Sequence, residues 1–135
     1  MAIFVRAVHH DDYPVLAPAI SAITPAEPHT QESLRHLDVY LERRGMEPAR
    51  VLAQDEHGGL LGHGLLVGRG SSQAVDVGVL PAARRRGVGT ALMAELERLA
   101  LAHGAAELRT RWVAETNQAA LTFLACRGFR ERERA

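Results

Sequence analysis

The sequence predicts a mixed α/β domain in which a mostly antiparallel sheet is flanked by helices. Apolar segments of strand length, joined by short turns, fill the chain between residues 50 and 80. Directly afterwards the apolar residues recur at helical spacing, and a strand, a helix and a further strand are expected beyond them. The chain has 135 residues, 47% of them hydrophobic, so a single domain covering residues 1–135 can bury its own core.

The first third of the chain is expected to hold one strand and two helices. The apolar run Ile3 to Val8 has strand composition. A helix is expected over residues 13–20, and its Pro18 is expected to bend or end it, because proline lacks the backbone N–H that a helix interior uses. Thr30 is placed to cap a second helix, which Gly45 would end.

The middle of the chain is expected to form three strands joined by glycine-containing turns, over Arg50–Gln54, Leu60–Val67 and Gln73–Leu80. Turns this short favour an antiparallel meander. From Thr90 to His103 the apolar residues fall on one face, which is typical of an amphipathic helix, and Gly104 would end it. The remaining elements are expected to be a strand, a helix and a short strand, over residues 107–113, 117–127 and 129–132.

Charge and composition exclude several classes of protein. The formal net charge is zero, with 16 basic and 16 acidic residues, and every basic residue is an arginine. A general nucleic-acid-binding protein needs a basic surplus, so no nucleic-acid partner is expected. The one cysteine, Cys126, can form no internal disulfide, and no metal site is expected. Because the chain shows neither a signal core nor an apolar run near the ~20 residues of a membrane span, it is expected to be cytoplasmic, without a membrane partner.

A glycine-rich turn joins the third strand of the meander to the amphipathic helix. The first residues of a helix present unpaired backbone N–H groups at the positive end of its dipole. Gly87 and Gly89 lack a Cβ, so the backbone there can approach a ligand closely, and Arg84, Arg85 and Arg86 add positive charge. These features favour a pyrophosphate-binding turn. The alternative is a tight turn with a solvated arginine cluster that binds nothing.

Two other nucleotide-binding motifs do not fit this turn. A Walker loop requires a lysine after its last glycine, where this chain has Thr90. A dinucleotide fingerprint requires a third small residue, where this chain has Leu92, and its strand would belong to a parallel sheet.

The turn resembles the phosphate loop of the GCN5-related N-acetyltransferase (GNAT) family. Arg84, Gly87 and Gly89 match the family's pattern of Gln or Arg, two residues, Gly, one residue, then Gly or Ala, and the approach through residues 79–81 resembles its usual Val-x-Pro. A second family signature is matched by Asn117, Ala120, Phe123, Leu124, Gly128 and Phe129. The resemblance extends from Ile3 to Phe129 and is weakest before Arg50.

The resemblance implies that acetyl-CoA lies between two parallel strands that splay apart. The backbone of Val77 and Val79 would pair with the pantetheine arm, and the Val79 N–H would stabilise the oxyanion that develops on the thioester. The side chains of Arg84 and Arg86 would supplement the backbone that holds the pyrophosphate. In full, the implied cofactor-binding residues are Val77, Val79, Arg84, Arg85, Arg86, Gly87, Val88, Gly89, Thr90, Asn117, Ala120 and Phe123.

The implied reaction is direct attack of a primary amine on the thioester in a ternary complex. The amine must lose a proton, and the candidate bases are Asp76, His29 and Glu27. For each of them an ordinary solvated side chain is the more common explanation. His9, His10 and Glu115 are weaker candidates. A covalent route through Cys126 ranks below direct transfer, because its position late in a helix suits a small buried residue.

Two features depart from the family pattern. Leu124 stands where many members have a tyrosine that protonates the departing thiolate, so a catalytically silent acyl-CoA-binding module is the alternative function. The chain also stops where members usually add one more strand. The last strand would then be missing, or a partner would supply it in a homodimer; a frayed charged tail is the simpler explanation. Residues 11–44 are expected to shape the acceptor pocket but carry no motif that identifies a small-molecule, peptide or protein amine.

Overall fold

Five strands form one sheet in the order β1-β2-β3-β4-β5 in the computed structural model of the chain, which describes residues 2–110. The strands are β1 (Phe4–Ala7), β2 (Ala49–Gln54), β3 (Leu60–Arg69), β4 (Ser72–Val79) and β5 (Glu107–Thr110). Neighbouring strands are antiparallel except β4 and β5, which are parallel. The predicted fold class, including the meander, is thereby confirmed.

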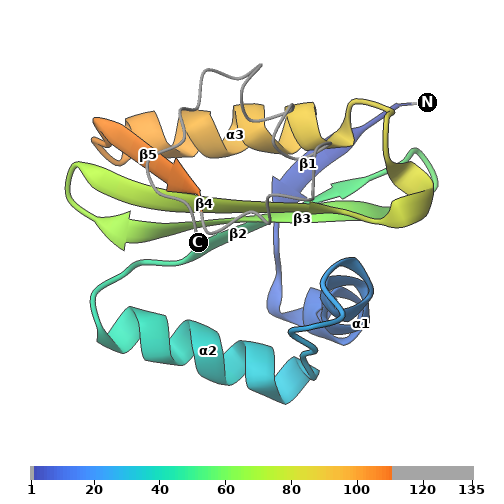
Figure 1. Cartoon of the computed structure of the whole chain (residues 1–135), viewed down its shortest axis with the longest axis horizontal. Helices are drawn as coiled ribbons and strands as arrows, with labels where there is room; N and C mark the ends of the chain where they lie inside the picture. Colours follow the sequence, from blue (N-terminus) through green and yellow to red (C-terminus); the bar gives the residue numbers. More distant parts are fainter. Residues whose placement is uncertain (1, 111–135) are drawn as a thin grey trace.

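Three helices cover the sheet, namely α1 (Tyr13–Ile23), α2 (Gln31–Arg43) and α3 (Val88–Ala102). Helix α3 lies on one face of the sheet, while α1 and α2 lie on the other (Figure 1). Because α3 connects β4 to β5 as a crossover, these two strands can run in the same direction. Their described pairing joins Ser72–Val75 to Glu107–Thr110, and β4 continues beyond it to Val79. The expected splaying of this pair and the expected final elements lie outside the described residues.

Helix α1 continues through Pro18 to Ile23, so this proline does not end the helix, and of the two expected effects only a bend is left. The lost N–H removes one helical hydrogen bond, but α1 compensates by packing. Leu16, Ala17 and Ile20 are buried against Leu34 of α2 in a separate small core. Tertiary burial therefore outweighs the local preference of the proline.

Thr30 caps α2 as expected. Its hydroxyl accepts a hydrogen bond from the Ser33 N–H at 3.1 Å, while the Ser33 hydroxyl oxygen accepts one from the Thr30 N–H at 2.9 Å. This reciprocal pair satisfies backbone donors that the first turn would otherwise leave unpaired. The cap fixes where α2 begins, and so where the preceding loop ends.

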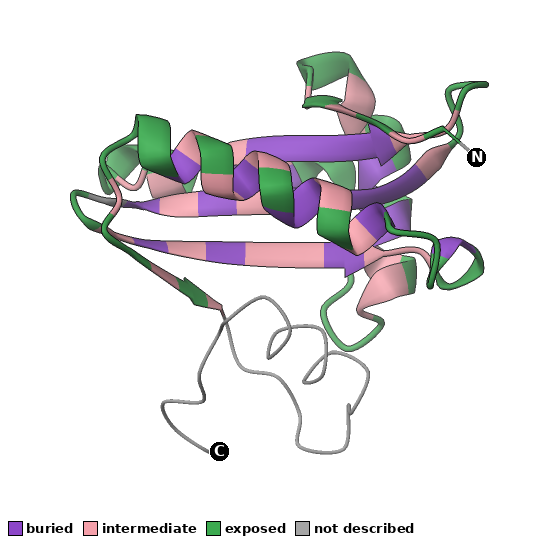
Figure 2. Cartoon of the chain, turned by 90° about the horizontal axis from the view of Figure 1, so that it is seen from above, coloured by how far each residue is buried: buried purple, intermediate pink, exposed green. Residues whose placement is uncertain are grey.

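The main core lies between α3 and the sheet. Leu92, Met93 and Leu96 of α3 are buried in this core. Figure 2 shows buried positions recurring along the helix beside the strands. On β3 they meet two glycines, Gly62 and Gly64, which carry no side chain to hold the helix away. A Cβ at Gly64 would lie 2.9 Å from the Leu96 Cδ1, at the end of a movable side chain.

We expect Gly62→Ala to lower the free energy of unfolding by about 1–3 kcal/mol. The added methyl would lie 2.5 Å from the Gly78 carbonyl oxygen on β4, and a backbone atom inside a sheet can move little. Gly64→Ala is the matched control with a smaller expected cost, because the Leu96 and Val51 side chains that it meets can shift. Urea denaturation of the three proteins tests this. Equal costs for the two substitutions would contradict it.

Candidate active site

The turn between β4 and α3 presents backbone N–H groups to solvent. Gly87 adopts a φ of 85° at the N-cap, a conformation that favours glycine, and Arg85 has a φ of 64°. The first helical hydrogen bond runs from the Ala91 N–H to the Gly87 carbonyl at 3.0 Å. The N–H groups of Val88, Gly89 and Thr90 therefore lie ahead of the helical ladder, at the positive end of the α3 dipole. This geometry suits a phosphate group.

The loop residues contribute to such a site in different ways. The side chains of Arg84, Arg85 and Arg86 are exposed, and the Arg84 Nε donates a hydrogen bond to the Val79 carbonyl at 3.3 Å. Arg84 thus braces the loop against the end of β4. The side chain of Val88 is 1% exposed in the main core, so this residue can serve a ligand only through its backbone. Helix α3 begins at Val88, two residues before the expected Thr90.

The end of β4 turns polar backbone groups away from β3. The Leu80 N–H donates to the Leu61 carbonyl at 2.9 Å, which makes this a hydrogen-bonded pair of the antiparallel ladder. In the same register Val79 lies opposite Gly62 and Val77 opposite Gly64. Because hydrogen-bonded pairs alternate along the ladder, the N–H and C=O groups of Val77 and Val79 face the β5 side. An extended ligand could pair with β4 along this edge.

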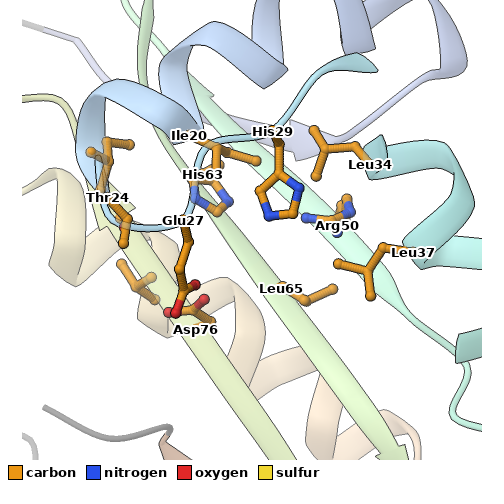
Figure 3. Close-up of a pocket in the computed structure, with 13 residues that line it drawn as sticks. Ile20, Thr24, Glu27, His29, Leu34, Leu37, Arg50, His63, Leu65 and Asp76 are labelled. Carbon is orange, nitrogen blue, oxygen red and sulfur yellow. The ribbon is translucent and has the colours of Figure 1, made fainter. Parts of the chain in front are cut away.

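A pocket lies on the opposite face of the same strand, under α1 and α2. It gathers the three proposed bases, Glu27, His29 and Asp76, together with Gly78 of β4. Figure 3 shows their side chains around the pocket, with Glu27 and His29 contributed by the loop that precedes α2. Side chains alternate across β4, so Asp76 faces this pocket while Val75, Val77 and Val79 pack toward α3.

The loop that carries Glu27 and His29 is held against α1. The His29 N–H donates a hydrogen bond to the Ser21 hydroxyl oxygen at 2.9 Å, and the Glu27 N–H donates to the Thr24 carbonyl at 3.0 Å. The His29 Nδ1 lies 3.1 Å from the Ser33 hydroxyl. These contacts give the loop a defined path along the pocket.

Arg50, which lines the pocket, belongs to a buried polar network. Arg50 on β2 contacts Asp38 on α2 through its Nε at 2.9 Å and its Nη2 at 2.8 Å, and the Tyr13 hydroxyl of α1 donates to the same carboxylate. The side chains of Arg50 and Asp38 are 6% and 12% exposed. Burial, with the neighbouring Asp38 carboxylate, raises the pKa of Tyr13 to about 12. The network ties both helices to one face of the sheet.

His63 lies on β3 in the same pocket wall, directly opposite Gly78. It is 7% exposed, and its Nδ1 has no hydrogen-bond partner among residues 2–110. Burial, aided by the positive charge of Arg50, lowers the pKa of His63 to about 4. The imidazole is therefore neutral at pH 7, with one ring nitrogen able to donate a hydrogen bond and the other to accept one.

Sequence reasoning did not find Arg50, Asp38, Tyr13 or His63. The available signal was a charged or polar residue within an apolar strand, such as Arg50 before Val51-Leu52-Ala53. Such residues are buried only when they have partners or a function.

The proposed pantetheine ligands Asn117, Ala120 and Phe123, with Leu124 and Cys126, lie outside the described residues.

One surface cluster combines groups that could bind a metal ion. His9, His10 and Asp11 bring one ligand atom each within 4.8 Å of one another, and all three residues are exposed. Contacts within the cluster explain the arrangement without an ion, since the His10 Nε2 lies 3.1 Å from the Asp11 Oδ1.

Among residues 2–110, no helix has the length and apolar character needed to cross a membrane.

The turn before α3, the backbone edge of β4 and the pocket under α1 and α2 thus lie together around one strand. The sequence model of the acetyltransferase (GNAT) family matches residues 9–129, and the chain belongs to this family. No curated protein sequence matches the chain.

Solved structures of similar fold span nearly the whole chain. An acetyltransferase from Trypanosoma brucei has 20% identity and a TM-score of 0.78, over 99% of this chain and 96% of the other. The aminoglycoside N-acetyltransferase AAC(6')-Iy, in complex with a bisubstrate analogue, has 19% identity and a TM-score of 0.80, over 100% and 95%. An N-acetyltransferase from Staphylococcus aureus Mu50 has 17% identity and a TM-score of 0.80, over 98% and 86%. At these identities the likeness establishes the shared fold.

Proposed function

We propose that this chain is an N-acetyltransferase that transfers an acetyl group from acetyl-CoA to a primary amine. The observation that carries the proposal is that one strand, β4, offers its backbone edge to one ligand and a side chain to another. The backbone edge of β4 at Val77 and Val79 continues into a phosphate-binding turn, while the Asp76 side chain of that strand enters the pocket of acidic and imidazole groups. A donor and an acceptor bound to these two sides would meet at β4.

The described residues include groups that would bind the parts of acetyl-CoA, the proposed donor. The N–H groups of Val88, Gly89 and Thr90 would hold the pyrophosphate at the N-terminus of α3, and the exposed arginines would add charge. The backbone of Val77 and Val79 would hold the extended arm, with the Val79 N–H beside the reacting carbonyl. A solved structure of AAC(6')-Iy contains CoA, which supports this choice of ligand. Asn117, Ala120 and Phe123 remain proposed contacts.

On the acceptor side, the pocket residues would bind the amine and take its proton. Acetyl-CoA would supply the acetyl group as a thioester, and the amine must be deprotonated for its nitrogen to bond the acetyl carbon. Asp76 is the proposed proton acceptor, because β4 carries it beside Val77, while Glu27 and His29 would orient the amine from the loop. Holding both substrates at one strand supplies the proximity on which direct transfer depends.

We expect Gly89→Glu to weaken acetyl-CoA binding at least ~10-fold, because a carboxylate among the N-terminal N–H groups of α3 would repel the pyrophosphate. A glutamate in the first turn favours the helix itself, so the loss would not reflect unfolding. Calorimetric titration with acetyl-CoA, CoA, ATP and NADH tests this, with Gly89→Ala as the matched control. Binding of acetyl-CoA and CoA alone by the unmodified protein is expected. A glutamate variant that binds as tightly as that protein would contradict the placement of the site.

Turnover distinguishes the transferase from a silent acyl-CoA-binding module. Both would bind acetyl-CoA, but only the transferase would release free CoA thiol when amines are added. An assay of thiol release across a panel of primary amines therefore decides between the two functions.

A further inference from the structure

The pocket holds one polar side chain that its own surroundings do not satisfy. His63 is 7% exposed, and its Nδ1 has no hydrogen-bond partner in the part of the chain that the structure describes. A buried polar atom without a partner is destabilising, and an apolar side chain would fill this place at lower cost. Because His63 also lines the pocket, its ring is placed to bind a ligand there through the Nε2 side, while the unpartnered Nδ1 is itself buried.

The surroundings of His63 leave one edge of its ring toward the pocket. Gly78 lies directly across the ladder, and a Cβ there would lie 3.2 Å from the His63 Nε2 and 2.9 Å from the Ile23 Cγ2. The Nε2 side of the ring therefore lies beside Gly78 and Ile23, and these two residues line the pocket together with His63. Figure 3 shows the His63 ring among the labelled residues that line the pocket, which include Glu27 and Asp76.

The charges around the ring restrict what it can bind. Burial, and then the positive charge of Arg50 on β2, lower the pKa of His63, so an ammonium group is disfavoured beside this ring. Glu27 from the loop and Asp76 from β4 line the same pocket and would repel a carboxylate. His29 of the loop completes the titratable groups that line the pocket with Arg50. A neutral imidazole is suited to an uncharged group that both donates and accepts hydrogen bonds, as a hydroxyl does.

We propose that His63 is a specificity-determining residue that selects acceptors carrying a hydroxyl group near the amine. The inference rests on the proposed acetyltransferase function and extends it to a class of acceptor. The amine would bind toward Asp76 and Glu27, while the hydroxyl would bind the His63 ring next to Gly78. The buried ion pair with Asp38 would hold Arg50 in its place in the pocket wall.

Matched small amines test the proposal as substrates of the whole chain with acetyl-CoA. Ethanolamine, propylamine and ethylenediamine are similar in size. Their far ends carry a hydroxyl, a methyl and a second ammonium group, respectively. Longer homologues of each test a greater distance between the amine and this end group. We expect kcat/KM for the hydroxylated amine to exceed that of its alkyl counterpart by roughly 2- to 10-fold, the range that one hydrogen bond provides. Ethylenediamine is expected to be a poorer substrate than ethanolamine, which has the same chain length.

His63→Phe keeps a ring of similar shape and removes both nitrogens. We expect it to bring the ratio of kcat/KM for the hydroxylated amine to that for propylamine close to one, whereas a merely structural role would lower both values and leave their ratio unchanged. Gly78→Ala, which would cover the ring edge, is expected to reduce the same preference, and His63→Gln is expected to retain part of it. Thermal denaturation shows that each variant is folded.

The outcomes separate this inference from the proposed function. If propylamine is acetylated but the hydroxyl preference is absent, or survives in His63→Phe, the role of His63 is refuted and the transferase stands. If no amine releases CoA thiol, the proposed function fails and this inference fails with it.

Discussion

Arg50→Met is expected to lower the free energy of unfolding by about 3–5 kcal/mol, the range found when one partner of a buried ion pair is removed. The substitution leaves the Asp38 carboxylate 12% exposed with only the Tyr13 hydroxyl as a described hydrogen-bond donor. It also frees α2 from β2, because the bonds at 2.9 Å and 2.8 Å that join them are lost. Urea denaturation followed by circular dichroism measures the loss.

Two companion variants make this prediction specific. Replacing both charged partners, as Arg50→Met with Asp38→Leu, removes the uncompensated carboxylate and should recover much of the stability that the single substitution loses. Arg98→Met removes the exposed partner of Glu95 on α3 and should leave the unfolding midpoint nearly unchanged. A double variant no more stable than Arg50→Met, or an equal effect of Arg98→Met, would show that the pair does not act as a buried ion pair.

The framework was predictable because its signals are local. The meander follows from apolar runs separated by short turns, and α3 follows from apolar residues at helical spacing that end near Gly104. The glycine turn was also predictable, since Gly87 stands where the chain requires a φ of 85°. Local signals failed at Pro18, where burial of Leu16, Ala17 and Ile20 keeps α1 helical.

The buried polar network beside the pocket was not predictable, because its members come from separate elements. Tyr13, Asp38 and Arg50 are brought together only when α1, α2 and β2 are assembled. The pairing of His63 with Gly78 depends on the register of β3 against β4, which no short segment of sequence specifies. The candidate bases were found as residue types in plausible segments. Their gathering around one pocket required the tertiary structure.

Strand β4 explains how a small domain can serve two ligands. Successive side chains of a strand point to opposite faces, and its backbone groups point along the sheet. At residues 76–79 this gives three directions: Asp76 and Gly78 toward the pocket, the valine side chains toward α3, and the backbone of Val77 and Val79 toward β5. The proposed reaction uses the first and third of these directions, while the second anchors the strand in the core.

His63→Phe is expected to remove about 3 kcal/mol of acid sensitivity from the stability of the protein between pH 6.5 and pH 4. The pKa of His63 is about 4 in the folded chain, against 6.5 for a free imidazole. Between these values the unfolded chain binds a proton that the folded chain does not, so stability falls as the pH falls. Above pH 6.5 both states are neutral at this site, and the histidine contributes no pH dependence.

The measurement is the free energy of unfolding in urea at a series of pH values for the unmodified protein and for His63→Phe. The difference between the two curves should be constant above pH 6.5 and change steadily down to pH 4, where it levels off. Asp12 adds its own loss only at lower pH, because its pKa is about 2 beside Arg6. Parallel curves for the unmodified protein and His63→Phe would mean that His63 takes up its proton at the same pH in the folded and the unfolded chain. Burial beside Arg50 would then not keep the ring neutral between pH 6.5 and pH 4.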